Sequence, residues 1–166
     1  FVISLNLCPF AAPVYPTQTR IRVIHAVELE EIYQQYLQEI AILAEHSNDE
    51  LATSLLVFPH QLSDFDLFLD FLSACEFALE EQGLAEYFQI APFHPDFQFA
   101  DDDTDDQTSV FTNKSPYPIF HLLRADEVEK VLKSPDVAGQ IVKRNKTTLA
   151  QMGSSQLHTL LNSIKS

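Results

Sequence analysis

The chain has only three glycines among its 166 residues, and this scarcity excludes several kinds of site. Loops that cradle a phosphate need repeated glycines for close approach of the backbone, so no such loop is predicted. The Gly-x-Ser-x-Gly motif of serine hydrolases is also absent. The two cysteines, Cys8 and Cys75, do not form a metal-type pair. They are typical of a reducing cytoplasm, where thiols stay free, and we therefore expect a cytoplasmic protein.

Basic residues are missing from a long part of the chain. No Lys or Arg lies between Val23 and Asn113, and residues 1–113 carry 2 basic and 20 acidic side chains. Nucleic acids and anionic membranes require a basic surface, so neither partner is predicted. No apolar run is long enough to span a bilayer, and no signal peptide is recognisable. Because the chain begins at Phe1, we expect an N-terminal piece to precede it.

Hydrophobic periodicity predicts one domain over residues 1–166. We expect strands at residues 20–24, 53–58, 87–93 and 119–123, and helices at residues 28–45, 63–82, 126–133, 136–143 and 155–164. The order is β-α-β-α-β-long loop-β, followed by a C-terminal helical segment at 126–166. It predicts an α/β or α+β fold in which helices cover a mixed four-stranded sheet.

The first three predicted strands are each followed by a histidine, namely His25, His60 or His94. Parallel strands bring their carboxyl ends to one edge of a sheet, where open α/β sheets bind ligands. Three imidazoles could therefore surround one crevice. The long acidic loop at residues 94–117 leaves from the same edge, and loops of this length are usually functional or mobile.

The aspartates at residues 101–106 suggest a calcium loop, but the match to an EF-hand fails. Asp106 stands where that motif needs glycine, and Thr112 stands where it needs glutamate. The simpler interpretation is a solvated acidic loop tip.

Three motifs resemble those of an uncharacterised bacterial family catalogued as domain of unknown function 1415. They are NLCPFA at residues 6–11, FHPDFQF at 93–99 and NKSPYPIFHLLR at 113–124. The resemblance runs over nearly the whole chain. It implies no activity, but it favours one shared constellation of residues: Cys8, His94, Asp96, Asn113, Ser115, His121 and Arg124. His25 and His60 fall outside the motifs.

Four of these residues are candidates for catalysis, and each has a structural alternative. His94 would act as general acid or base, oriented by Asp96, or the two would form a structural turn. His121 lies in an apolar strand, where a core histidine satisfied by a carbonyl is the alternative. Cys8 would be a nucleophile if a nearby base or cation lowered its pKa; otherwise it is a buried, inert thiol.

The other three residues are candidates for substrate binding. Arg124 could bind an anionic group bidentately or pair with nearby acids. Asn113 and Ser115 lie in a turn-like context, where a hydroxyl commonly caps the turn. No cofactor and no metal are predicted, although His94, Asp96 and His121 together could hold a divalent ion.

Two classes of function remain open. The first is an enzyme, hydrolase-like from its residue types alone, acting on a small anionic molecule. The second is a non-catalytic binding or scaffold protein that uses residues 94–124 as its recognition surface. The enzyme requires Cys8, His94 and His121 to share one pocket. In an antiparallel pairing, a register shift of one residue decides whether the two histidines share a face.

Overall fold

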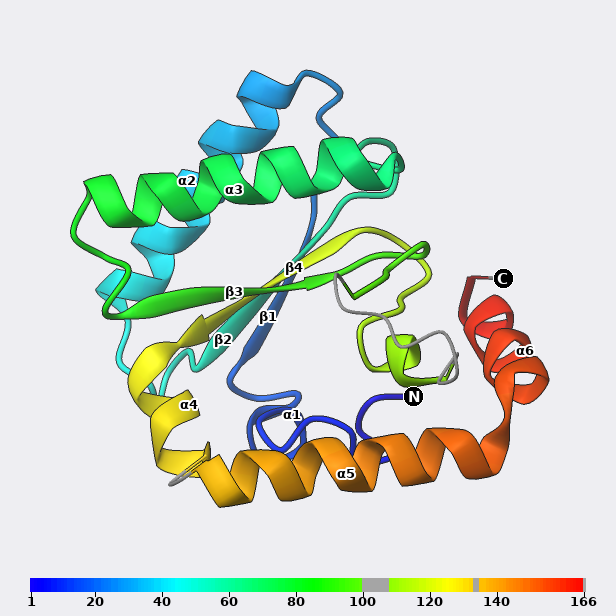
Figure 1. The fold of residues 1–166 in the computed structure, drawn as a ribbon. Helices are drawn as coiled ribbons and strands as arrows, with labels where there is room; N and C mark the ends of the chain where they lie inside the picture. Colours follow the sequence, from blue (N-terminus) through cyan, green and yellow to red (C-terminus); the bar gives the residue numbers. More distant parts are fainter. Residues whose placement is uncertain (100–107, 133–134, 166) are drawn as a thin grey trace.

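The computed structural model describes residues 1–99, 108–132 and 135–165, and its centre is a mixed sheet of four strands (Figure 1). The strands are β1 (Thr19–Val23), β2 (Thr53–Val57), β3 (Phe88–Phe93) and β4 (Ile119–Arg124), in the order β1-β2-β4-β3. β1 and β2 pair in parallel, and β4 is antiparallel to both of its neighbours. The predicted mixed sheet and its element order are confirmed.

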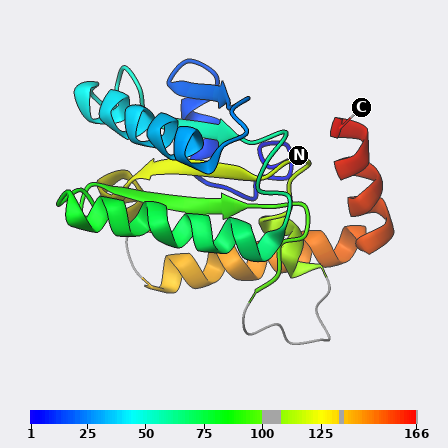
Figure 2. The same ribbon diagram turned by 90° about the horizontal axis from the view of Figure 1, so that it is seen from above.

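Helices cover both faces of this sheet. The helices α2 (Leu29–Glu45) and α3 (Phe65–Glu81) lie together on one face, called here the α2/α3 face (Figures 1 and 2). The other elements lie beyond the opposite face or at its ends: α1 (Ala11–Val14), the 3-10 turn η1 (Ser109–Thr112), α4 (Ala125–Leu132), α5 (Pro135–Met152) and α6 (Ser154–Lys165). α5 extends well past the helix predicted at residues 136–143.

The main core fills the space between the sheet and the helices α2 and α3. α2 contributes Ile32, Tyr36, Ile40 and Leu43, which recur at helical spacing on one side and are nearly fully buried. The N-cap of α3 is Asp64, which accepts a hydrogen bond from the Leu67 N–H at 2.9 Å. The helix itself begins at Phe65, two positions after the start predicted at residue 63.

One carboxylate is buried within this core. Glu39 of α2 is fully buried, and its oxygens accept from Arg20 Nε at 2.8 Å, Ser54 Oγ at 2.8 Å and Arg22 at 3.4 Å. A buried charge is tolerated only when it is paired and hydrogen-bonded. The two arginines of β1 therefore have a structural role on the α2/α3 face.

A second, smaller core joins the N-terminal residues to the C-terminal helices. It consists of Leu7, Val110, Phe111, Leu149, Leu157 and Leu161. Asn145 of α5 donates to the Leu7 carbonyl at 2.7 Å, and Arg144 donates to the Asn6 carbonyl. The N-terminal segment is thereby held in place opposite the sheet. None of the helices in the described residues is both long enough and apolar enough to cross a membrane.

Candidate functional site

The register of β3 against β4 places His94 and His121 on opposite faces of the sheet. Ala91 pairs with His121, and Phe93 pairs with Ile119. Residues directly opposite one another share a face, and successive residues alternate. His121 therefore lies with Ala91 and Phe93, whereas the next residue, His94, turns to the α2/α3 face. The site predicted from Cys8, His94 and His121 together is not assembled.

His94 is fully buried, and both of its ring nitrogens are occupied. Its Nε2 contacts the Leu62 carbonyl at 3.0 Å, and its Nδ1 accepts from the backbone N–H of Asp96 at 3.0 Å. The ring packs against Phe65 and Phe68 of α3, with centroids 5.1 and 4.9 Å away. Burial lowers the pKa of His94, so the imidazole is a neutral bridge between loops.

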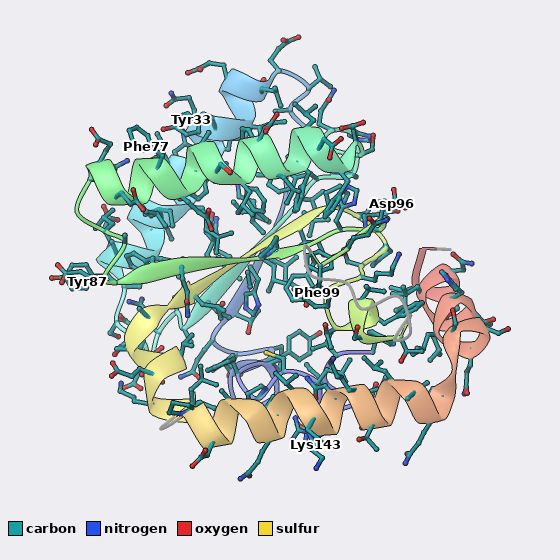
Figure 3. All side chains as sticks on the ribbon, in the orientation of Figure 1. Tyr33, Phe77, Tyr87, Asp96, Phe99 and Lys143 are labelled. Atoms are coloured by element: carbon teal, nitrogen blue, oxygen red, sulfur yellow. The ribbon has the colours of Figure 1, made fainter. Side chains whose placement is uncertain are left out.

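Asp96 does not orient this imidazole through its carboxylate. Its side chain is exposed at the periphery of the molecule (Figure 3), and only its backbone contacts the ring. No three metal-ligating side chains converge anywhere in the described ranges. His94, Asp96 and His121 consequently offer no shared position for a divalent ion.

Asn113 and Arg124 hold the backbone together. The Asn113 side chain donates to the Pro92 carbonyl at 3.0 Å, and the backbone carbonyl of Asn113 accepts from the His94 N–H at 3.1 Å. The Arg124 guanidinium donates to the carbonyls of Leu43, His46 and Leu51 at 2.7 to 3.0 Å. It thus satisfies carbonyls at the end of α2, which the helix itself leaves unpaired, and it is committed to the backbone.

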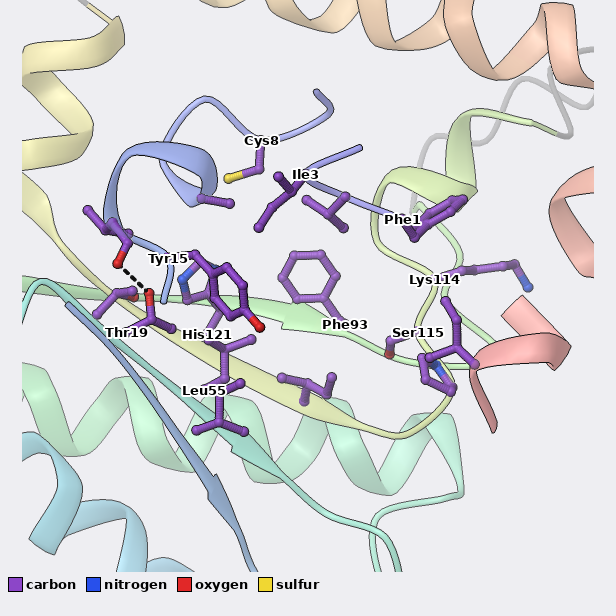
Figure 4. A pocket seen from close by; sticks show the side chains of 18 of the residues that line it. Phe1, Ile3, Cys8, Tyr15, Thr19, Leu55, Phe93, Lys114, Ser115 and His121 are labelled. Atoms are coloured by element: carbon purple, nitrogen blue, oxygen red, sulfur yellow. Dashed lines mark hydrogen bonds between the residues drawn. The ribbon is translucent and has the colours of Figure 1, made fainter. Parts of the chain in front are cut away.

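A pocket of about 260 Å³ lies on the other face of the sheet, called here the pocket face (Figure 4). β1, β2, β3 and β4 form its floor, the N-terminal residues form its roof, and α6 closes one side. The lining is almost entirely apolar. It comprises Phe1, Val2, Ile3, Cys8, Ala11, Val14, Tyr15, Thr19, Ile21, Thr53, Leu55, Phe93, Lys114, Ser115, Pro116, Ile119, His121, Leu161 and Ile164. Three of the predicted site residues are brought together here: Cys8, Ser115 and His121.

Among the described residues that line this pocket, His121 alone has a buried polar atom without a protein partner. The side chain is 7% exposed, and its Nε2 has no hydrogen bond. Burial lowers the pKa of His121 to about 4, so the imidazole is neutral near pH 7. An unpaired buried donor or acceptor costs about 1–3 kcal/mol. A hydrogen-bonding group placed in the pocket would offset that cost.

Four other polar side chains around the pocket are engaged by backbone carbonyls. The hydroxyls of Thr19, Thr53 and Ser115 donate to the carbonyls of Val14, Leu122 and Tyr117. Lys114 donates to the Pro95 carbonyl at 3.0 Å, and its ammonium is turned away from the pocket centre (Figure 4). His121 Nε2 is therefore a buried hydrogen-bonding atom without a protein partner within a mostly apolar surface.

Cys8 lines the roof of the same pocket. Burial raises the pKa of its thiol, and this effect outweighs the backbone N–H groups of Phe10 and Ala11 that favour the thiolate. The residue is consequently a neutral thiol near pH 7. Together with a neutral His121, it does not form the ion pair that activates a cysteine nucleophile.

The apolar lining was missed by sequence analysis. Ile21 and Leu55 lie in strands that the sequence predicts. Side chains alternate along a strand, so these two lie on the pocket face and their neighbours lie on the α2/α3 face. A period-two pattern does not tell whether that face is packed or hollow, because the answer depends on residues 1–15 and α6, which are distant in the sequence. The signal that was available is the continuous apolar run of β2, which is typical of a strand covered on both faces.

Two of the three strand-end histidines do meet. His25 follows β1 and His60 follows β2, and His25 Nδ1 lies 3.4 Å from His60 Nε2. His94 follows β3, which is separated from β2 by β4. The predicted crevice of three imidazoles is therefore reduced to a pair.

We expect Arg124→Lys to lower the free energy of unfolding by about 2 kcal/mol, because hydrogen bonds from a charged donor contribute about 1.5–3 kcal/mol and an ammonium cannot reach all three carbonyls. Urea denaturation measures the loss. Arg144→Lys is the matched control, since this exposed arginine contacts the backbone at a single carbonyl. Equal losses in the two variants would contradict the structural role of Arg124.

We expect His121 to make stability depend on pH. Its folded pKa is about 4, whereas an unfolded imidazole titrates near 6.5. Between these values the unfolded chain binds a proton that the folded chain does not, so stability falls as the pH falls. From pH 7 to pH 5 the wild type should lose about 2 kcal/mol more than His121→Gln in urea denaturation. The buried His94 contributes the same pH dependence to both proteins, so its effect cancels in the comparison. Identical pH profiles of the unfolding free energy in the wild type and in His121→Gln would contradict the low pKa assigned to His121.

Comparison with known proteins identifies the chain only at the level of a family. Searches of curated proteins and of solved structures returned no match. A family model described as protein of unknown function, DUF1415, matches residues 1–159. This match confirms the resemblance carried by the three sequence motifs. The chain belongs to the DUF1415 family.

Proposed function

We propose that this protein binds a small, uncharged and mostly apolar molecule in the pocket that Cys8 and His121 line. The observation that carries the proposal is the unpaired Nε2 of His121 within an apolar lining. Ligand sites combine such surfaces with a few polar groups that fix orientation. The loop and strand residues between 93 and 121 supply part of this lining, which favours the binding function of that segment.

The volume of the pocket bounds the size of the ligand. A cavity of about 150 Å³ accommodates benzene, so by proportion a pocket of about 260 Å³ accommodates roughly ten non-hydrogen atoms. The polar group of the ligand is best a hydroxyl. A hydroxyl both donates and accepts, so it can pair with Nε2 in either tautomer of the imidazole.

An anionic ligand, as expected from the sequence, does not suit this pocket. Arg124 is committed to backbone carbonyls elsewhere, and Lys114 is engaged by Pro95. A carboxylate near His121 would have no cation to offset the cost of its burial. The proposed ligand is therefore neutral.

The test compares 2-naphthol with naphthalene, which differ by one hydroxyl. We expect 2-naphthol to bind one site per chain and to bind about three- to tenfold more tightly than naphthalene, since a hydrogen bond contributes about 0.5–1.5 kcal/mol net. Fluorescence titration measures both, because the chain contains no tryptophan to interfere. In His121→Leu the preference for 2-naphthol should vanish.

Two further variants locate the binding. Leu55→Phe narrows the pocket floor and should weaken both probes. His46→Leu changes an exposed histidine that does not line the pocket and should leave both affinities unchanged. The proposal is overturned if neither probe binds saturably, or if binding is insensitive to both Leu55→Phe and His121→Leu.

The second candidate function is an enzyme acting on such a molecule, and the presence of Cys8 and His121 in one pocket favours it. The two candidates predict different thiol chemistry. A catalytic cysteine would exist as a thiolate at or below pH 8 and would depend on His121. A merely lining cysteine would remain a thiol, and the substitution of His121 would not affect it.

We expect Cys8 to behave as the lining thiol. Its alkylation by iodoacetamide at pH 7 should be slower than that of N-acetylcysteine, because only the thiolate reacts and burial raises the pKa of the Cys8 thiol. The rate should still rise above pH 9 and should be the same in His121→Gln. Peptide mass spectrometry distinguishes Cys8 from buried Cys75. A plateau below pH 8 that disappears in His121→Gln would establish the enzymatic candidate.

A further inference from the structure

The exposed ends of β1 and β2 bring two imidazoles together away from the pocket. His25 Nδ1 and His60 Nε2 are 3.4 Å apart, and their ring centroids are 5.5 Å apart. Because the centroids are farther apart than the nitrogens, both nitrogens lie on the facing sides of the rings. Neither residue lines the pocket of the pocket face, so this pair is independent of the proposed function.

The fold holds this pair in position. β1 and β2 pair in parallel up to Val23 and Val57, and Ile24 N–H donates to the Val57 carbonyl at 2.8 Å just beyond the strands. Ile24 and Phe58, which flank the two short loops, are each 1% exposed. The two histidines themselves are exposed. The backbone beneath the pair is thus anchored, while the nitrogens remain open to solvent.

The separation of the nitrogens fits shared coordination of one ion. At 3.4 Å the two nitrogens also lie at the long end of hydrogen-bonding distance from each other. Two imidazoles that bind one tetrahedral ion at about 2.0–2.1 Å place their nitrogens about 3.3–3.4 Å apart. The pair therefore has the spacing of two neighbouring ligands of one ion.

We propose that His25 and His60 bind a divalent transition-metal ion, of which Zn²⁺ is the representative. Imidazole suits Zn²⁺, Cu²⁺ and Ni²⁺, whereas Mg²⁺ and Ca²⁺ prefer oxygen ligands. Since no third metal-ligating side chain joins the pair among the residues described, water completes the coordination. The ion would fasten the β1–α2 loop to the β2–α3 loop at the carboxyl edge of the sheet.

The experiment is calorimetric titration of the full chain with Zn²⁺ in a large excess of Mg²⁺, which masks the 24 acidic side chains. We expect one Zn²⁺ per chain and a rise in melting temperature on binding. His25→Gln and His60→Gln should each weaken binding by about tenfold or more, since even outer-shell partners of a metal contribute 10- to 100-fold. Binding should also weaken from pH 7 to pH 5, because protons compete for the imidazoles.

His46→Gln is the matched control. This histidine is also exposed, but its Nδ1 contacts the Ile42 carbonyl at 2.8 Å, so the substitution should leave Zn²⁺ affinity unchanged. Circular dichroism confirms that the three single variants and the double variant fold. The proposal is overturned if the wild type shows no saturable binding of Zn²⁺, or if the double variant His25→Gln/His60→Gln retains the affinity of the wild type.

Discussion

Strand β4 runs antiparallel between β2 and β3, and the placement of the candidate side chains depends on this insertion. Its register aligns Leu55, His121 and Ala91 in one row across the sheet. A shift of one residue would exchange the two faces. Phe120 and Leu122 hold the register, because both are fully buried on the α2/α3 face. Exposing two such side chains would cost about 3–6 kcal/mol, so the position of His121 on the pocket face is a consequence of core packing.

The local patterns of the sequence sufficed to predict the strands and most helices. Each of these elements is defined by a periodicity within its own residues. Such patterns do not predict the strand order, because the position of β4 between β2 and β3 is decided by contacts between segments that are distant in the sequence. The length of α5 was underestimated for a related reason. The buried residues of this helix, Asn145 and Leu149, both lie in its second half. One of them is polar, so the sequence shows no clear apolar stripe there, and this half is stabilised by contacts with the N-terminal segment and η1.

The candidate site was predicted in part. The shared motifs contain residues that hold the backbone together and residues that line the pocket. The sequence alone does not distinguish these two roles. Asn113 and Arg124 satisfy backbone carbonyls where chain segments cross, and a polar residue with this role is as constrained as a ligand-binding one. Cys8 and His121 line the pocket. What distinguishes the two kinds is whether the polar atoms already have partners, and this depends on geometry.

The contrast between the two buried histidines follows from that criterion. His94 and His121 are both desolvated and both have lowered pKa values, but His94 uses both nitrogens within the chain and His121 leaves Nε2 unpaired. A fully satisfied imidazole stabilises the loops that it joins. An unsatisfied one lowers stability unless a further group binds it, and native structures retain such groups mainly at functional sites.

The pocket also depends on the C-terminal helices, although they contribute little of its lining. Its roof is the N-terminal segment, which reverses at Asn6, a residue with a positive φ of 51° that asparagine tolerates better than most residues. Arg144 and Asn145 of α5 donate to the carbonyls of Asn6 and Leu7, at this reversal and directly after it. Undocking α5 would release the roof and expose the apolar floor. A ligand that bridges floor and roof would bind only the docked state, and its binding free energy would therefore add to the stability of the α5 interface.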